Sequence, residues 1–237
     1  MKRRDKFDHL AIETTGLADP APVIQTFFLD EDMQSQLALD AVVTVVDAKH
    51  IWQHWEADEA QEQIAFADVI LLNKTDLVTP ENLEELEKRI RSVNAMAKIY
   101  RTRNSELGMD ALLGVKAFDL ERALEIDPNF LGEDAHVHDE SVYSLALVEK
   151  GALDGQKLNA WMSELLSTKG TDIFRMKGIL NIAGENDRFV FQGVHMIFDG
   201  RPDKPWKANE TRKNELVFIG RNLDEAKLKQ DFQACIV

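Results

Sequence analysis

Residues 68–76, Asp-Val-Ile-Leu-Leu-Asn-Lys-Thr-Asp, decide the expected fold. Their apolar part has the continuous pattern of a strand buried on both faces, and so does the run Ala-Val-Val-Thr-Val-Val at residues 41–46. After Thr79 and Pro80, apolar side chains recur at helical spacing, which predicts an amphipathic helix. Buried strands that alternate with such helices predict βαβ units and a parallel, doubly wound sheet.

Two further strands and a helix are expected in this half of the chain. Residues 7–13 form a short apolar run, and residues 98–101 form another. Between them, Asp19 and Pro20 have the pattern of a helix start, with the aspartate as cap and the proline in the first turn.

The second half of the sequence has a different pattern. Strands are expected at residues 142–148, 174–183, 188–198 and 216–219, and helices after the capping residues Asp154 and Asp224. A turn at residues 184–187 joins two of these strands, so an α+β unit with a mainly antiparallel sheet is predicted. The acidic, aperiodic stretch 127–140 suits a linker, which predicts domains at 1–126 and 141–237.

The composition excludes several classes of protein. The 237 residues include 42 acidic and 28 basic side chains, which gives a net charge of -14 and argues against generic binding to nucleic-acid phosphates. The apolar runs are too short to cross a bilayer, so no membrane partner is expected. A single cysteine, Cys235, excludes a disulfide framework and predicts a reducing, cytoplasmic location.

The motif at residues 73–76 has the chemistry needed to recognise a guanine base. In an open α/β sheet, a loop at the carboxyl end of a strand faces the ligand crevice. Asp76 can accept both N–H donors of guanine, Asn73 can bridge the loop and the purine N7, and Lys74 can lay its aliphatic stem over the base. The alternative interpretation is a polar turn that ends a strand.

The segment at residues 13–20, Glu-Thr-Thr-Gly-Leu-Ala-Asp-Pro, is a second candidate site. Glu13 at a strand tip can hold Mg²⁺, and Gly16 can offer a backbone N–H to a γ-phosphate, as in a nucleotide switch. A plain strand followed by a helix is an equally good interpretation of this segment.

Three histidines are candidate metal ligands. His136 and His138 would point to the same side of an extended segment, among carboxylates that suit Zn²⁺ or Co²⁺. His195 lies in an alternating run, on the same predicted face as Phe189 and Phe191. The alternatives are a solvated linker for the first two and a hydrogen-bonded, half-buried strand residue for His195.

Taken together, these segments resemble the CobW family of P-loop GTPases. The resemblance rests on residues 13–20, 42–50, 63–77, 136–144, 189–195 and 216–224 and covers essentially the whole chain. It implies a partial P-loop GTPase-type parallel sheet with helices, followed by an α+β C-terminal domain. It also implies a cytosolic metallochaperone that binds GTP and Mg²⁺ and couples GTP hydrolysis to delivery of zinc or cobalt to a client metalloprotein.

By the same resemblance, Glu13 is the acid near Mg²⁺, Gly16 belongs to the switch, and Asn73, Lys74 and Asp76 select guanine. Family members also have a Gly-Lys-Ser/Thr phosphate loop and a Cys-x-Cys-Cys motif, and this sequence contains neither. The chain is therefore expected to lack the N-terminal section of a full member, through a truncated gene prediction, a split gene or real loss. The alternative function is a metal-binding or client-docking fragment without GTP hydrolysis of its own.

Overall fold

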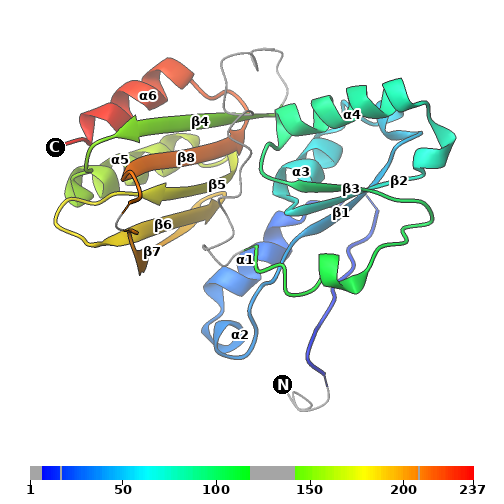
Figure 1. Cartoon of the computed structure of the whole chain (residues 1–237), viewed down its shortest axis with the longest axis horizontal. Coiled ribbons are helices and arrows are strands. Elements are labelled where there is room, and N and C mark those ends of the chain that lie inside the picture. The colour runs from blue at the N-terminus through cyan, green and yellow to red at the C-terminus, as the bar shows by residue number, and fades with distance from the viewer. Residues whose placement is uncertain (1–6, 17, 118–141, 208) are drawn as a thin grey trace.

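The first sheet in the computed structural model is parallel, as the sequence predicts. The structure describes residues 7–16, 18–117, 142–207 and 209–237. Three strands lie side by side in the order β1 (Val43–Asp47), β2 (Val69–Asn73) and β3 (Lys98–Arg101) (Figure 1). Helix α3 (Asp58–Phe66) connects β1 to β2, and helix α4 (Pro80–Val93) connects β2 to β3. The central strand β2 is buried at every residue, which explains its unbroken apolar sequence.

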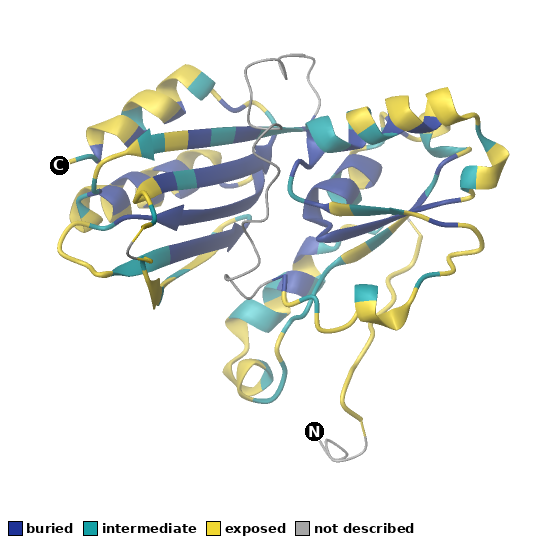
Figure 2. Cartoon of the chain, viewed as in Figure 1, coloured by how far each residue is buried: buried dark blue, intermediate teal, exposed yellow. Residues whose placement is uncertain are grey.

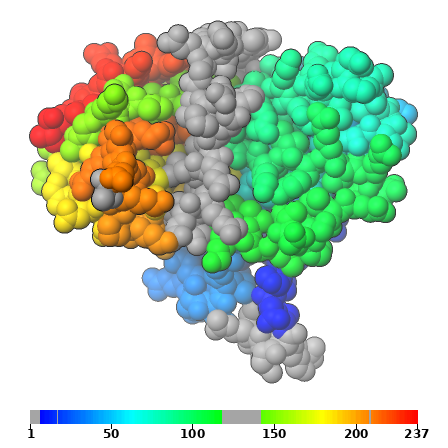
Figure 3. All heavy atoms as spheres, viewed as in Figure 1, coloured from blue at the N-terminus to red at the C-terminus, as the bar shows by residue number. Residues whose placement is uncertain are grey.

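The prediction of a strand at residues 7–13 is wrong for the described backbone. These residues are extended but pair with no strand, and Leu10 and Ile12 are 51% and 54% exposed. A strand needs a neighbour to accept its backbone hydrogen bonds. In the described part of the chain, nothing pairs with the outer edge of β1, where Val45 is 57% exposed. The segment from residue 7 projects from the body of the molecule at the foot of Figure 3.

The helix predicted after Asp19 forms, with a different cap. Helix α1 (Ala21–Leu29) begins after Pro20, which is its N-cap residue, and Asp19 Oδ1 accepts a hydrogen bond from the Ala21 N–H at 2.8 Å. A short helix, α2 (Glu31–Gln36), follows. In the described part of the chain, single turns of 3-10 helix occur at η2 (Ile51–Gln53), η3 (Thr75–Leu77) and η4 (Met109–Ala111).

The second sheet is antiparallel, as predicted. Its strand order is β4 (Tyr143–Lys150), β8 (Lys213–Gly220), β5 (Ile173–Leu180), β6 (Asp187–Val194) and β7 (Ile197–Pro205). The run 188–198, predicted as one strand, is split because a turn at His195 and Met196 reverses the chain between β6 and β7. The proposed linker 127–140 lies outside the described residues.

Two helices cover one face of the second sheet. Helix α5 (Gly155–Lys169) is capped by Asp154, which accepts hydrogen bonds from two backbone N–H groups, and α6 (Glu225–Ala234) is capped by Asp224. Both caps were predicted. Apolar side chains of the two helices, among them Trp161, Leu165 and Phe232, pack against the sheet to form one core.

A second core spans both sheets. Phe174, Val194 and Ile219 of the second sheet belong to the same buried cluster as Phe66 of α3 and Ile90 of α4. Figure 2 shows buried residues on the facing sides of the two halves. The core of the first half therefore continues onto the second sheet, which also has a core of its own on its other side.

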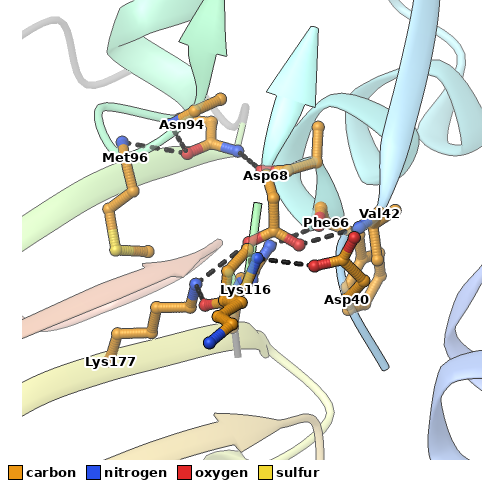
Figure 4. Close-up of polar contacts among 12 residues, drawn as sticks. Asp40, Val42, Phe66, Asp68, Asn94, Met96, Lys116 and Lys177 are labelled. Atoms are coloured by element: carbon orange, nitrogen blue, oxygen red, sulfur yellow. Dashed lines mark hydrogen bonds and ion pairs between the residues drawn. The ribbon is translucent and has the colours of Figure 1, made fainter. Parts of the chain in front are cut away.

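A buried ion cluster centred on Asp68 lies at this junction (Figure 4). Asp68 precedes β2, and its Oδ2 accepts a hydrogen bond from the Val42 N–H at 2.9 Å. Its Oδ1 contacts the Arg175 guanidinium and accepts a hydrogen bond from Lys177 Nζ at 2.9 Å. Arg175 also donates to the Phe66 carbonyl, and Lys177 donates to the Ala117 carbonyl at 2.7 Å.

The charges in this cluster depend on one another. Burial alone would raise the pKa of the Asp68 carboxyl, but Arg175 and Lys177 outweigh it and hold that pKa below its usual value. Burial and the nearby Arg175 lower the pKa of Lys177 to about 8, although Asp68 opposes this. Among the described residues, Asp68 is thus the carboxylate that these two buried cations share.

We expect Asp68→Asn to destabilise the protein by about 3–5 kcal/mol, because it leaves Arg175 and Lys177 buried without their shared carboxylate. Urea unfolding followed by circular dichroism measures the change. Glu87→Gln is the matched control. It breaks the exposed pair between Glu87 Oε1 and Arg101 Nε at 2.6 Å, which contributes only about 0–1 kcal/mol.

The same variant has a pH signature. Because the folded-state pKa of Asp68 is lowered, its contribution is present above the unfolded carboxyl pKa of roughly 3.9 and is lost as the pH falls through the folded value. The stability difference between wild type and Asp68→Asn should shrink on acidification. Equal stability of the two proteins at neutral pH would contradict the central role of Asp68.

Candidate nucleotide-binding site

The carboxyl ends of the three parallel strands meet at one edge of the first sheet. Asp47 at the end of β1 is paired in register with Asn73 at the end of β2, and β3 ends just before Thr102. Polar side chains therefore gather where an α/β sheet normally binds its ligand. The predicted motif, residues 73–76, lies at this edge.

Asn73 ties the motif to the loop that follows β3. The side chain is buried, and its Oδ1 accepts hydrogen bonds from the Ser105 N–H at 2.8 Å and from Thr102 Oγ1 at 3.2 Å. Thr75 makes a second link, because its Oγ1 donates to the Thr102 carbonyl at 3.1 Å. Asn73 therefore connects the motif to the loop after β3, and its contact with a purine N7 remains a prediction.

The loop at residues 102–105 was missed by the sequence analysis. Asn104 and Ser105 both have left-handed backbone conformations, with φ of 52° and 55°. The polar, turn-prone sequence Thr-Arg-Asn-Ser directly after a short strand was the signal that could have found it. The loop forms one side of the candidate site, next to the motif.

Lys74 and Asp76 are on the solvent side of the same turn. The backbone of Lys74 is left-handed, with φ of 62°, and this reverses the chain between β2 and η3. Lys74 Nζ lies 2.6 Å from Asp47 Oδ2. Asp76 is exposed, so its carboxylate is open to a ligand. The turn therefore presents the Lys74 side chain and the Asp76 carboxylate to solvent.

Glu13 and Gly16, in the segment before α1, are the second pair of predicted site residues. Both are exposed, and Gly16 has φ of 38°, a conformation that favours glycine. Gln63 of α3 holds the segment, because its Nε2 donates to the carbonyls of Gly16 and Ala18, each at 2.9 Å. Among the described residues, no hydrogen bond joins Glu13 or Gly16 to residues 73–76. Their predicted roles remain predictions.

The structure gives His195 surroundings different from those the sequence predicted. It lies in the turn after β6, with φ of 51°, and its ring packs against Phe66 at 5.3 Å and Phe174 at 5.4 Å between centroids. Burial lowers the pKa of the imidazole. His195 therefore sits in the aromatic contact between the two sheets rather than on a continuous strand face.

The described residues provide no further ligands beside His195 for the predicted metal site. Across those residues, no group of three His, Cys, Asp or Glu side chains is arranged to hold a metal ion. His136 and His138 lie outside the described residues. No helix in the described ranges is long and apolar enough to cross a membrane.

The fold and the strand-end site define an α/β protein with an appended antiparallel domain, and two family models match these parts. Residues 1–101 match the CobW/HypB/UreG nucleotide-binding domain, and residues 142–236 match the cobalamin synthesis protein cobW C-terminal domain. The chain belongs to the CobW family.

Two relatives are similar to this chain over most of its length. The zinc chaperone YjiA of Escherichia coli is 34% identical, over 96% of this chain and 70% of its own length. The zinc-regulated GTPase metalloprotein activator 1 of Schizosaccharomyces pombe is 32% identical, over 94% of this chain. The chain spans 62% of the length of that relative.

A solved structure confirms the fold. The crystal structure of Zn(II)-bound YjiA GTPase from E. coli superimposes with a TM-score of 0.78 at 29% identity, over 94% of this chain and 69% of that chain. The expected α/β sheet followed by an antiparallel domain is thus confirmed, and so is membership of a family that contains zinc chaperones and GTPases.

We expect Asn73→Ala to release the loop at residues 102–105, because the buried Oδ1 is the acceptor for both Thr102 and Ser105. Loss of these bonds should destabilise the protein by about 1–3 kcal/mol and speed hydrogen exchange at the Ser105 amide. Exchange followed by NMR or mass spectrometry tests this. Asn82→Ala, at an exposed position in α4, is the control. Unchanged exchange at Ser105 would show that Asn73 does not hold the loop.

Proposed function

We propose that this chain binds a guanine nucleotide at residues 73–76 and acts as a GTP-dependent zinc metallochaperone. The observation that carries the proposal is the position of the motif at the carboxyl end of β2, fastened to the loop after β3 by Asn73. This rigid turn leaves the carboxylate of Asp76 exposed, where it can pair with the two adjacent N–H donors of guanine.

In this proposal, Glu13 and Gly16 take part in Mg²⁺ binding and in the response to GTP hydrolysis. Glu13 holds Mg²⁺, which supplies charge stabilisation for phosphoryl transfer, and Gly16 belongs to the segment that responds to the γ-phosphate. Two hydrogen bonds from Gln63 connect this segment to α3. A change there would reach the second sheet, because Phe66 of the same helix packs on Phe174.

The cargo in this proposal is zinc, with cobalt as the second candidate metal. The names of the relatives support zinc, since YjiA is a zinc chaperone and the yeast protein is a zinc-regulated activator of a metalloprotein. His136, His138 and His195 are the proposed ligands in this chain, and a cytoplasmic client metalloprotein is the proposed recipient. Imidazole nitrogen is a normal ligand for either metal.

The second candidate function is metal binding or client docking without GTP hydrolysis. It is favoured by the absence of a Gly-Lys-Ser or Gly-Lys-Thr sequence, because the phosphate loop supplies much of the binding energy in P-loop proteins. Zinc competition with a chromophoric chelator separates the candidates. Zinc binding that is lost in a His136→Ala, His138→Ala double variant and is indifferent to GTP favours this function over the first.

Base selectivity tests the first function most sharply. We expect GDP and GTP to bind in the presence of Mg²⁺ while ATP does not. Asp76→Asn should weaken GDP binding roughly 5- to 150-fold, because one bidentate base contact is lost. The same variant should gain affinity for xanthosine diphosphate, whose base has a carbonyl where guanine has an amino group.

Isothermal titration calorimetry measures these affinities. Asp110→Asn, which changes an exposed aspartate in η4, is the matched control and should bind GDP like the wild type. Equal binding of GDP and ATP, or no binding of GDP at millimolar concentration, would refute the proposed guanine site.

A further inference from the structure

The end of β1 places a carboxylate next to the motif. Asp47 is the last residue of β1 and lies opposite Asn73 in the parallel ladder. The Ala48 N–H donates to the Asn73 carbonyl at 2.9 Å, so this pairing continues one residue beyond the strand. The position of Asp47 relative to the motif is therefore fixed by backbone structure and not by a flexible loop.

The Asp47 carboxylate is itself held in place. Its Oδ1 accepts hydrogen bonds from the backbone N–H groups of Lys49 and His50, at 3.0 and 3.1 Å. Its Oδ2 contacts Lys74 Nζ at 2.6 Å and His50 Nδ1 at 3.0 Å. These contacts outweigh partial burial and hold the pKa of Asp47 below its usual value. The carboxylate is thus a fixed negative charge at the edge of the site.

Lys74 spans the gap between the two strand ends. Its left-handed backbone sets the direction in which the side chain leaves the turn, and Asp47 fixes the far end of that side chain. The aliphatic stem of Lys74 therefore runs from the backbone of the turn to the Asp47 carboxylate, and both of its ends are held. Without the contact to Asp47, the exposed Lys74 side chain would sample many rotamers.

The ordinary explanation is a surface ion pair, which would affect stability little. Lys74 is 46% exposed and Asp47 is 32% exposed, so the pair is too open to be a strong structural element. Yet three separate hydrogen bonds orient the carboxylate that receives the ammonium group. An oriented carboxylate would hold the Lys74 side chain in one conformation, which is useful if that side chain must contact a ligand.

We propose that Asp47 is a positioning residue of the guanine site, which orders Lys74 before the nucleotide arrives. The inference rests on the proposed function, because Lys74 is the side chain that covers the base. Asp47 does not contact the base and does not select it, a role that belongs to Asp76. Ordering one long side chain in advance is worth about 2- to 10-fold in affinity.

The test is a set of GDP titrations by calorimetry on the full chain. Asp47→Asn should weaken GDP binding about 2- to 10-fold without changing the preference for GDP over xanthosine diphosphate. Asp47→Glu should recover part of the loss. Lys74→Met keeps most of the stem and removes the ammonium group, so adding Asp47→Asn to it should have no further effect.

Two controls separate positioning from other roles. His54→Ala removes an exposed imidazole at the end of η2 that, among the described residues, makes no hydrogen bond to Asp47, and it should keep GDP affinity at the wild-type level. The midpoint of thermal unfolding should fall only slightly in Asp47→Asn, because the asparagine oxygen can still accept the backbone N–H groups of Lys49 and His50 and only the exposed ion pair is lost. A readout in apo protein is also available, because the NMR signal of the Lys74 ammonium group should be protected from exchange in wild type and not in Asp47→Asn.

The outcomes are distinct. If wild type binds GDP and Asp47→Asn binds it equally well, the inference is wrong and the proposed function stands. An equal loss from Asp47→Asn with and without Lys74→Met would also overturn it, because Asp47 would then act independently of Lys74. If wild type itself fails to bind GDP, the proposed function fails first and this inference fails with it.

Discussion

The buried carboxylate of Asp68 is the interaction on which the arrangement of the two sheets depends. It precedes the central strand of the first sheet and pairs with Arg175 and Lys177 from the central part of the second sheet. An ion cluster in this position is costly to desolvate, and it exists only if both sheets supply their members in the correct register. Apolar packing of Phe66 on Phe174 accompanies the cluster, because the Phe66 carbonyl also accepts a hydrogen bond from Arg175.

This constraint also fixes the candidate site. Strand β2 is only five residues long, so Asp68 at its start and Asn73 at its end are parts of one short rigid element. Asp68 orients the beginning of the strand against the second sheet, and Asn73 holds the loop at residues 102–105 at the other end. The base-recognition loop and the interface between the sheets are thus connected through a strand that cannot bend without losing its ladder.

Local sequence patterns predicted the helices and strands that depend on periodicity and capping. They did not predict features that depend on residues distant in the sequence, such as strand pairing and the contact between Asp47 and Lys74. The buried strands, the helix after Thr79 and the antiparallel second half follow from periodicity and caps, and the structure confirms them. Residues 7–13 have an apolar pattern, yet without a described neighbour they form no strand. His195 was placed on a strand face because the pattern conceals the reversal that separates β6 from β7. No local pattern reveals that Asp47 meets Lys74, since the contact arises from parallel pairing across 27 positions.

The most direct test of the account is a two-dimensional NMR titration of the labelled chain with GDP and Mg²⁺. A guanine site at the carboxyl ends of β1, β2 and β3 predicts that the largest amide shifts fall at residues 73–76 and 102–105 and at Asp47, with smaller changes elsewhere. Shifts concentrated in the second sheet, or none at saturating nucleotide, would contradict the claim that this strand edge recognises the base.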